Sequence, residues 1–115
     1  VATHFRTDLS EVTETQFFFN YTIEIQNTNP FDVQLISRDW YIFDSLNDAA
    51  YVSGSGVVGE QPLIEPGKYY QYTSGAILDT PVGTMQGHYE FKGADNALFK
   101  VPIDVFRLAV SKVLN

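Results

Sequence analysis

The sequence contains no cysteine, few basic residues and no long apolar run. The absence of cysteine excludes disulfides, thiolate nucleophiles and zinc–cysteine sites. Seven basic residues stand against fourteen acidic ones, giving a net charge of −7 without any basic stripe. We therefore expect binding neither to nucleic acid nor to an anionic membrane surface. Because no transmembrane segment and no apolar signal core are readable, a cytoplasmic protein is expected.

The chain length and the strand pattern predict the fold class. A chain of 115 residues is typical of one domain, spanning residues 1–115 with its core at about 3–108. Seven or so short strands separated by turns are readable, and helical periodicity is nearly absent. This pattern predicts an all-β fold, an antiparallel β-sandwich of about seven to eight strands. A closed barrel is the alternative.

The first half of the chain carries two strong strand patterns. Residues 16–27 alternate apolar and polar side chains, which predicts a strand with one buried face. Residues 32–44 predict a second strand, whose alternation slips between Leu35 and Trp40 and so indicates a β-bulge. Arg38 is then expected on the same face of the strand as Trp40.

The second half predicts further strands with defined interruptions. Residues 50–58 are expected to form a third strand, and the KYYQYTS segment a fourth, ending near Gly75. Residues 84–92 and 98–108 are expected to pair as a hairpin. Pro102 cannot donate a ladder hydrogen bond, so its strand is expected at a sheet edge or at a bulge.

A glycine-rich stretch, residues 54–59, has the sequence Gly-Ser-Gly-Val-Val-Gly, which matches GxGxxG. A dinucleotide fingerprint needs a helix after the glycines, and Pro62 with Pro66-Gly67 prevents one here. Two interpretations follow. Gly54, Gly56 and Gly59 serve turns and close backbone approach, or their N–H groups form a nest that binds an anion without a helix. Arg38 could assist such an anion, provided that it lies near the loop.

Few residues suggest catalysis or metal binding. The two histidines, His4 and His88, lie on predicted strands, where histidine is more often a surface or pairing residue than a base, and no GxSxG elbow is present. We therefore expect no enzymatic activity and no catalytic residue. Asp39, Asp44 and Asp48 are close in sequence but lack the EF-hand pattern, so no metal site is predicted from them.

An aromatic cluster offers another candidate surface. It comprises Trp40, Tyr69, Tyr70 and Tyr72. Tryptophan in a sandwich is usually a core residue, whereas both faces of KYYQY are aromatic. Part of this cluster is therefore expected to be exposed and available to a partner.

Several ordered motifs resemble those of the ApaG (CorD) family of small bacterial proteins. They are FNYTIEIQN, QLISRDW, VSGSGVVGEQPLIEPG, YTSG and LDTPVGTMQGHYEF. The resemblance covers residues 3 to about 108. Two departures stand out: Asp39 occupies a position where the family often has histidine, and the family's IPxF pattern is changed at residues 103–106.

The resemblance implies a sandwich of the immunoglobulin or fibronectin type III kind. It links the chain to cobalt and magnesium homeostasis, which is the sole ground for expecting weak Mg²⁺ or Co²⁺ binding; no cofactor is expected otherwise. Genes of the family often neighbour one for a diadenosine-tetraphosphate hydrolase, and similar domains in larger eukaryotic proteins serve protein interaction. With no appended region readable, the stand-alone bacterial form is expected.

Two functional hypotheses follow. The first is a non-enzymatic interaction protein that binds a protein partner through a sheet edge or the loop ends. The second is an accessory protein that binds pyrophosphate or a nucleotide, such as diadenosine tetraphosphate, on Gly54, Gly56 and Gly59 with help from Arg38. Monomer and dimer are both compatible with the sequence.

Overall fold

The computed structural model describes residues 2–6, 16–46 and 49–110, with residues 2–6 described for the backbone alone. The chain order of its elements is β1 (Ala2–Arg6), β2 (Phe17–Gln26), β3 (Val33–Asp44), β4 (Ala50–Ser55), β5 (Leu63–Ile64), β6 (Tyr69–Leu78), β7 (Val82–Lys92), the 3-10 turn η1 (Ala94–Asn96) and β8 (Leu98–Ala109). In the described part of the chain, no helix is long and apolar enough to cross a bilayer.

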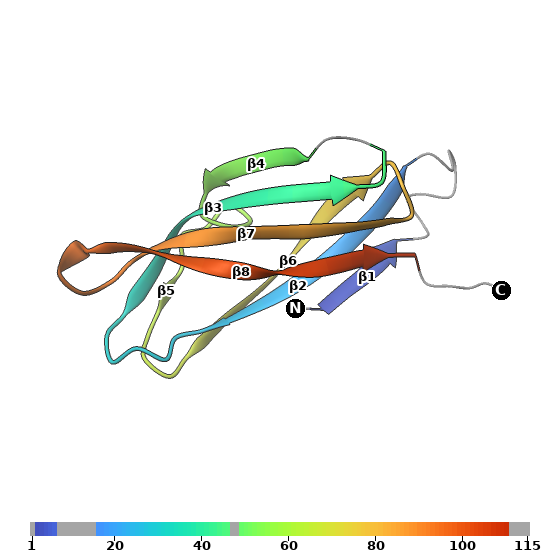
Figure 1. Cartoon of the computed structure of the whole chain (residues 1–115). Helices are drawn as coiled ribbons and strands as arrows, with labels where there is room; N and C mark the ends of the chain where they lie inside the picture. Colours follow the sequence, from blue (N-terminus) through green and yellow to red (C-terminus); the bar gives the residue numbers. More distant parts are fainter. Residues whose placement is uncertain (1, 7–15, 47–48, 111–115) are drawn as a thin grey trace.

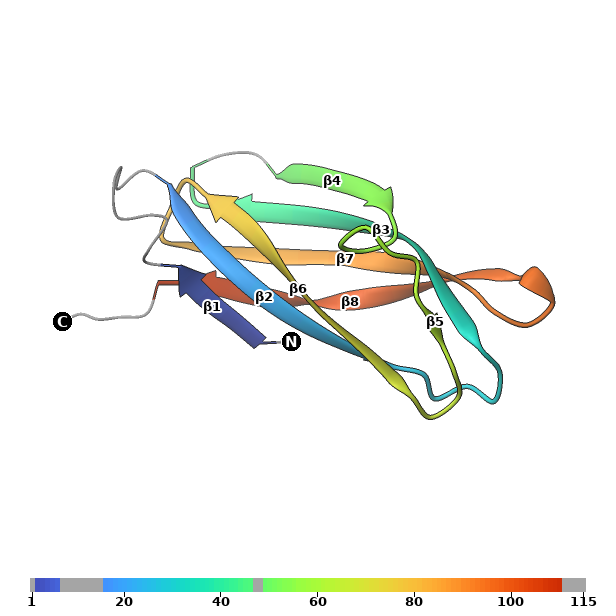
Figure 2. The same cartoon turned by 180° about the vertical axis from the view of Figure 1, so that it is seen from behind.

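The strands form two sheets that pack face to face (Figure 1). One sheet has the order β1-β2-β6, and the other has the order β4-β3-β7-β8 with β5 added to β3. Every pairing is antiparallel. The predicted all-β antiparallel sandwich of seven to eight strands is therefore confirmed. Figure 2 shows β6 at one border of the smaller sheet, with β2 between it and β1.

The core lies between the sheets, where the alternating side chains of each strand meet. On β2 the expected face is buried: Phe19, Tyr21 and Ile23 are almost inaccessible. The opposite face of the same strand stays half-exposed or exposed. This alternation fixes the register of β2, because a one-residue slip would move the whole apolar set into water.

A bulge in β3 brings Trp40 into the core, as the sequence predicted. The register with β7 shifts between Leu35 and Ser37, so both Leu35 and Trp40 are buried. Rings of Tyr21 and Phe106 each lie 5.7 Å from the indole at steep angles. The indole N–H has no hydrogen-bond partner among the described residues, and ring faces are the weak acceptors available to it.

Two local expectations were wrong, and one short strand was missed. The third strand ends at Ser55 rather than at residue 58, because Gly56 has a φ of 62° and turns the chain out of the extended region. Gly75 lies inside β6, paired with Asn20, instead of ending a strand. The residues on both sides of Gly75 continue the alternation of buried and exposed side chains, and their strand pairing outweighs the tendency of a single glycine to end a strand. The two-residue strand β5 went unrecognised within the Pro- and Gly-rich segment.

The predicted hairpin of the last two strands is confirmed, with Pro102 in the border strand β8. The register shifts once: Met85 pairs with Phe106, whereas Gly87 pairs with Ile103. Two residues of β8 therefore stand opposite Gln86 alone. Such a bulge bends its strand and opens the surface beside it.

Candidate functional site

The glycine stretch folds into a tight two-residue turn. The N–H of Val57 donates to the carbonyl of Glu60 at 2.8 Å, and the N–H of Glu60 donates back at 2.9 Å. Val58 and Gly59 between them both have positive φ, 48° and 78°. This is the geometry of a type I′ turn, which normally carries Asn-Gly or Gly-Gly rather than a β-branched residue at its first central position.

Gly54 and Gly56 meet separate steric demands. At Gly56 a Cβ would overlap the carbonyl oxygen of Glu60, and the residue also has left-handed φ. At Gly54 a Cβ would lie 3.1 Å from Nη1 of Arg38, so glycine leaves room for the guanidinium. The N–H of Gly56 donates to the carbonyl of Ile36 at 2.7 Å. The first interpretation, glycines for turns and close approach, accounts for these positions.

Arg38 reaches the glycine stretch, which the sequence left undecided. It pairs with Gly54 across β3 and β4. Its Nη1 atom donates to the carbonyl of Gly56 at 2.7 Å and to that of Ser55 at 3.2 Å. The loop thus turns acceptor oxygens toward the cation, whereas a phosphate nest would turn N–H donors outward. Phosphate binding by Gly54, Gly56, Gly59 and Arg38 stays a prediction.

Tyrosines from the two sheets meet beside Arg38. The hydroxyls of Tyr72 and Tyr89 are 2.5 Å apart in the core. Burial raises the pKa of both groups well above 10, and the nearby Arg38 charge offsets part of this for each. Tyr70 donates to Glu60 at 3.2 Å, and Tyr69 is 63% exposed. The aromatic cluster is therefore divided: Trp40 and Tyr72 belong to the core, and Tyr69 faces solvent.

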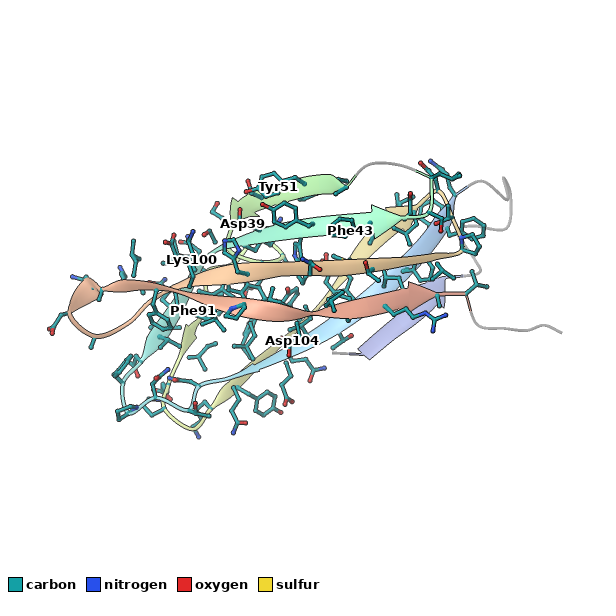
Figure 3. All side chains as sticks on the ribbon, viewed as in Figure 1. Asp39, Phe43, Tyr51, Phe91, Lys100 and Asp104 are labelled. Atoms are coloured by element: carbon teal, nitrogen blue, oxygen red, sulfur yellow. The ribbon has the colours of Figure 1, made fainter. Side chains whose placement is uncertain are left out.

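A hydrogen-bonded row crosses the outer face of the larger sheet. Asp39 on β3 pairs with His88 on β7, and the two side chains meet at 2.9 Å between Oδ2 and Nε2. The hydroxyl of Tyr51, on β4, donates to the other oxygen of Asp39. This hydrogen bond raises the pKa of Tyr51. Figure 3 shows Asp39 and Tyr51 on neighbouring strands of the uncovered face.

Sequence reasoning missed this row, because its members come from three strands. Strand alternation places the side chains of Asp39 and Trp40 on opposite faces of β3. Only the cross-strand register shows that His88 and Tyr51 are neighbours of Asp39. Of the other candidates, Asp44 accepts from the backbone N–H of Leu46 at 3.0 Å. The side chain of His4 and all of Asp48 lie outside the described residues.

One border strand stands out as a binding edge. Strand β6 is ten residues long, and no described residue other than those of β2 joins its ladder. Its sequence, YYQYTSGAIL, holds no charged residue and no proline. Such a row of unpaired N–H and C=O groups is a template for another strand.

A hollow of about 420 Å³ borders the same edge. Its walls come from Gly75, Ala76 and Ile77 of β6 and from Ile42 and Val52 of the facing sheet. Phe18, Phe19 and Asn20 of β2 complete the lining. Val52 and Ile77 are 42% and 55% exposed, so apolar surface is accessible where the backbone edge is also open.

Comparisons with known proteins give the family. The family model of the ApaG domain matches residues 7–93. The chain belongs to the ApaG family. It is similar to Protein ApaG of Proteus mirabilis, with 50% identity over 102 residues that cover 89% of this chain and 82% of the relative. Protein ApaG of Erwinia tasmaniensis is 53% identical over 98 residues, covering 85% and 78%.

Solved ApaG-like structures agree with the fold. The chain is similar to the crystal structure of the putative ApaA protein from Bordetella pertussis, with 41% identity and a TM-score of 0.91, covering 97% of this chain and 91% of that one. A second structural-genomics target has the same TM-score at 39% identity, covering 98% and 86%.

Proposed function

We propose that this ApaG-family chain is a non-enzymatic interaction protein that binds an extended segment of a protein partner by strand addition to β6. The observation that carries the proposal is the apolar hollow beside an uncharged, unpaired strand edge. Main-chain hydrogen bonds along the edge would supply affinity, and the hollow would select alternate side chains of the added strand.

Comparison with the border strands β1, β4 and β8 favours β6. Strand β1 has five residues and β4 has six, so each offers a short ladder. Strand β8 carries Lys100, Pro102, Asp104 and Arg107 as well as a bulge. Charges, proline and bulges are the features by which natural proteins block strand addition. Strand β6 has none of these protections along its ten described residues.

The hollow defines the chemistry of the partner segment. Val52 and Ile42 line the hollow together with the inward-facing Ala76, so an added strand would direct every second side chain toward an apolar wall. A volume of about 420 Å³ accommodates branched aliphatic or aromatic side chains. The expected segment is therefore extended, free of proline, and apolar at alternate positions.

Two further expectations belong to the proposal. That the protein is not an enzyme remains an expectation, and the hydrogen bond of His88 within the described chain goes to Asp39. The described residues contain no group of three His, Asp or Glu side chains arranged for a metal ion. A role in cobalt or magnesium homeostasis rests on the family resemblance, and a cytoplasmic location rests on the sequence, in which no transmembrane segment and no apolar signal core are readable.

The nucleotide alternative has one favourable observation, the contact between Arg38 and the glycine stretch. Pyrophosphate would have to compete with the carbonyls of Ser55 and Gly56 for the guanidinium. An NMR titration with pyrophosphate and diadenosine tetraphosphate tests it. Saturable amide shifts confined to residues 54–59 would favour this alternative over strand addition.

Photo-crosslinking from position 77 tests strand addition. A photoreactive side chain at Ile77 in living cells should trap one partner segment, and a peptide of that segment should bind the purified chain. Ile77→Lys should weaken binding roughly tenfold or more, about 1.4 kcal/mol, because a charge on the edge blocks pairing.

Leu98→Lys is the matched control, since Leu98 is a border-strand residue of similar exposure, 58% against 55%. It should leave the peptide affinity unchanged. Equal affinity of Ile77→Lys and the original chain would contradict the proposal.

A further inference from the structure

A second hollow lies on the outer face of the larger sheet, remote from the edge of β6. It has a volume of about 370 Å³ and forms where the bulge places two β8 residues opposite Gln86. Tyr41, Gln86 and His88 line it on one side, and Pro102, Asp104 and Val105 line it on the other. Tyr41 is 40% exposed, so its ring is accessible from solvent.

The side chains around this hollow are held by a network. Asp39 binds Nε2 of His88 and also accepts from the hydroxyl of Tyr51. The Tyr51 ring lies 5.0 Å from that of Tyr41. At Gly87 a Cβ would overlap the carbonyl oxygen of Asp39, so glycine permits the close approach of β3 and β7 here.

The polar and aromatic groups that line the hollow favour a cation that donates hydrogen bonds. The Asp104 carboxylate and the Gln86 amide oxygen accept hydrogen bonds, and the face of Tyr41 is the negative side of its quadrupole. No lysine or arginine is among the described residues that line the hollow, and its histidine, His88, is paired with Asp39. A planar cation with several donors satisfies a carboxylate and stacks on a tyrosine ring at once.

We propose that the hollow at the β7–β8 bulge binds a guanidinium group, with Asp104 as its carboxylate partner and Tyr41 as its stacking surface. The His88–Asp39–Tyr51 row positions the imidazole at the rim. The guanidinium belongs either to a free small molecule or to an arginine side chain of a protein, and the chemistry of recognition is the same.

Titration with argininamide, followed by NMR and calorimetry, tests this site. Saturable shifts at Gln86, His88 and Asp104 are expected, with a dissociation constant on the order of 1 mM for a single cationic group. Citrullinamide, the neutral isostere, should cause no saturable shift. A peptide with one central arginine separates the sources: tighter binding than argininamide assigns the site to a protein side chain, and equal or weaker binding assigns it to a free molecule.

Asp104→Asn should weaken argininamide binding roughly fivefold, the effect of one partly exposed charge contact. Asp104 is exposed, so this change is compatible with folding. The control is Asp95→Asn, which removes an exposed acid from the β7–β8 loop and keeps the net charge equal to that of the test variant. The proposal is overturned by equal affinity of the two variants, by binding of citrullinamide, or by the absence of saturation.

Discussion

The glycine stretch and the edge of β6 both present backbone at the surface, but they differ in how that backbone is satisfied. In the glycine stretch, the N–H groups of Gly56, Val57 and Glu60 donate to backbone carbonyls. The guanidinium of Arg38 donates to two more carbonyls, those of Ser55 and Gly56. Along β6, the described chain pairs one side only. A motif that looks like a ligand site thus bonds three of its N–H groups within the chain, while a plain strand offers an edge that the described chain does not pair.

The largest expected effect separates two glycines. Gly56→Ala should lower the free energy of unfolding by at least about 3 kcal/mol, because it adds left-handed strain to an overlap with backbone. Gly75→Ala in β6 should change it by less than about 0.5 kcal/mol, since the nearest atom to a Cβ there is 3.4 Å away. Urea denaturation measures both. Similar losses would remove the structural distinction between loop and edge.

The stability of the protein at alkaline pH tests whether the inner face of β6 is packed, in contrast to its open edge. Burial raises the pKa of Tyr72 and Tyr89, so on raising the pH an unfolded chain releases these protons first. The free energy of unfolding should be independent of pH below about pH 9 and should fall by roughly 3 to 5 kcal/mol by pH 12. Tyr72→Phe should flatten this decline. A pH-independent midpoint of unfolding up to pH 12 would show that the pair is hydrated.

Arg38→Ala separates a structural role of this cation from a ligand role. The change removes two hydrogen bonds to Ser55 and Gly56 and should cost about 1 to 2 kcal/mol of stability. Binding of the β6 peptide should be unaffected. Unchanged stability together with loss of pyrophosphate binding would reverse the interpretation of the loop.

The smallest effect concerns Val58, a β-branched residue with a φ of 48°. Val58→Asn should stabilise the protein by about 0.5 to 1 kcal/mol, because asparagine adopts left-handed φ readily and Asn-Gly suits a type I′ turn. Thermal unfolding measures this. Since Val58 is 60% exposed, a destabilised variant would mean that its side chain has a contact beyond the turn itself.

The fold was predictable because it follows from local patterns. The alternation in β2 and the slip before Trp40 each identified a buried face, and both agree with the structure. Gly75 was wrongly predicted to end a strand, because a glycine flanked by strand-forming residues can adopt the extended conformation of its neighbours.

The candidate sites were less predictable, because they depend on register and on the packing of sheets. Asp39 and His88 are 49 positions apart, and only their pairing across β3 and β7 makes them partners. The hollow beside β6 is lined by residues of both sheets, among them Val52 of β4 and Ile77 of β6. The spacing of residues along one strand predicts neither the pairing of Asp39 with His88 nor the hollow beside β6. For Arg38, the alternation along the strand predicted which face of β3 carries the side chain. The structure shows in addition that Arg38 pairs with Gly54 on β4.

Amide hydrogen exchange on the chain without any partner tests the central claim most directly. The account predicts slow exchange at Gly56, Val57 and Glu60, whose N–H groups are bonded, and fast exchange at every second residue of β6, whose N–H groups point to the open edge. Uniform slow exchange along β6 together with fast exchange in the glycine stretch would contradict it, because the loop would then be the surface with unused donors.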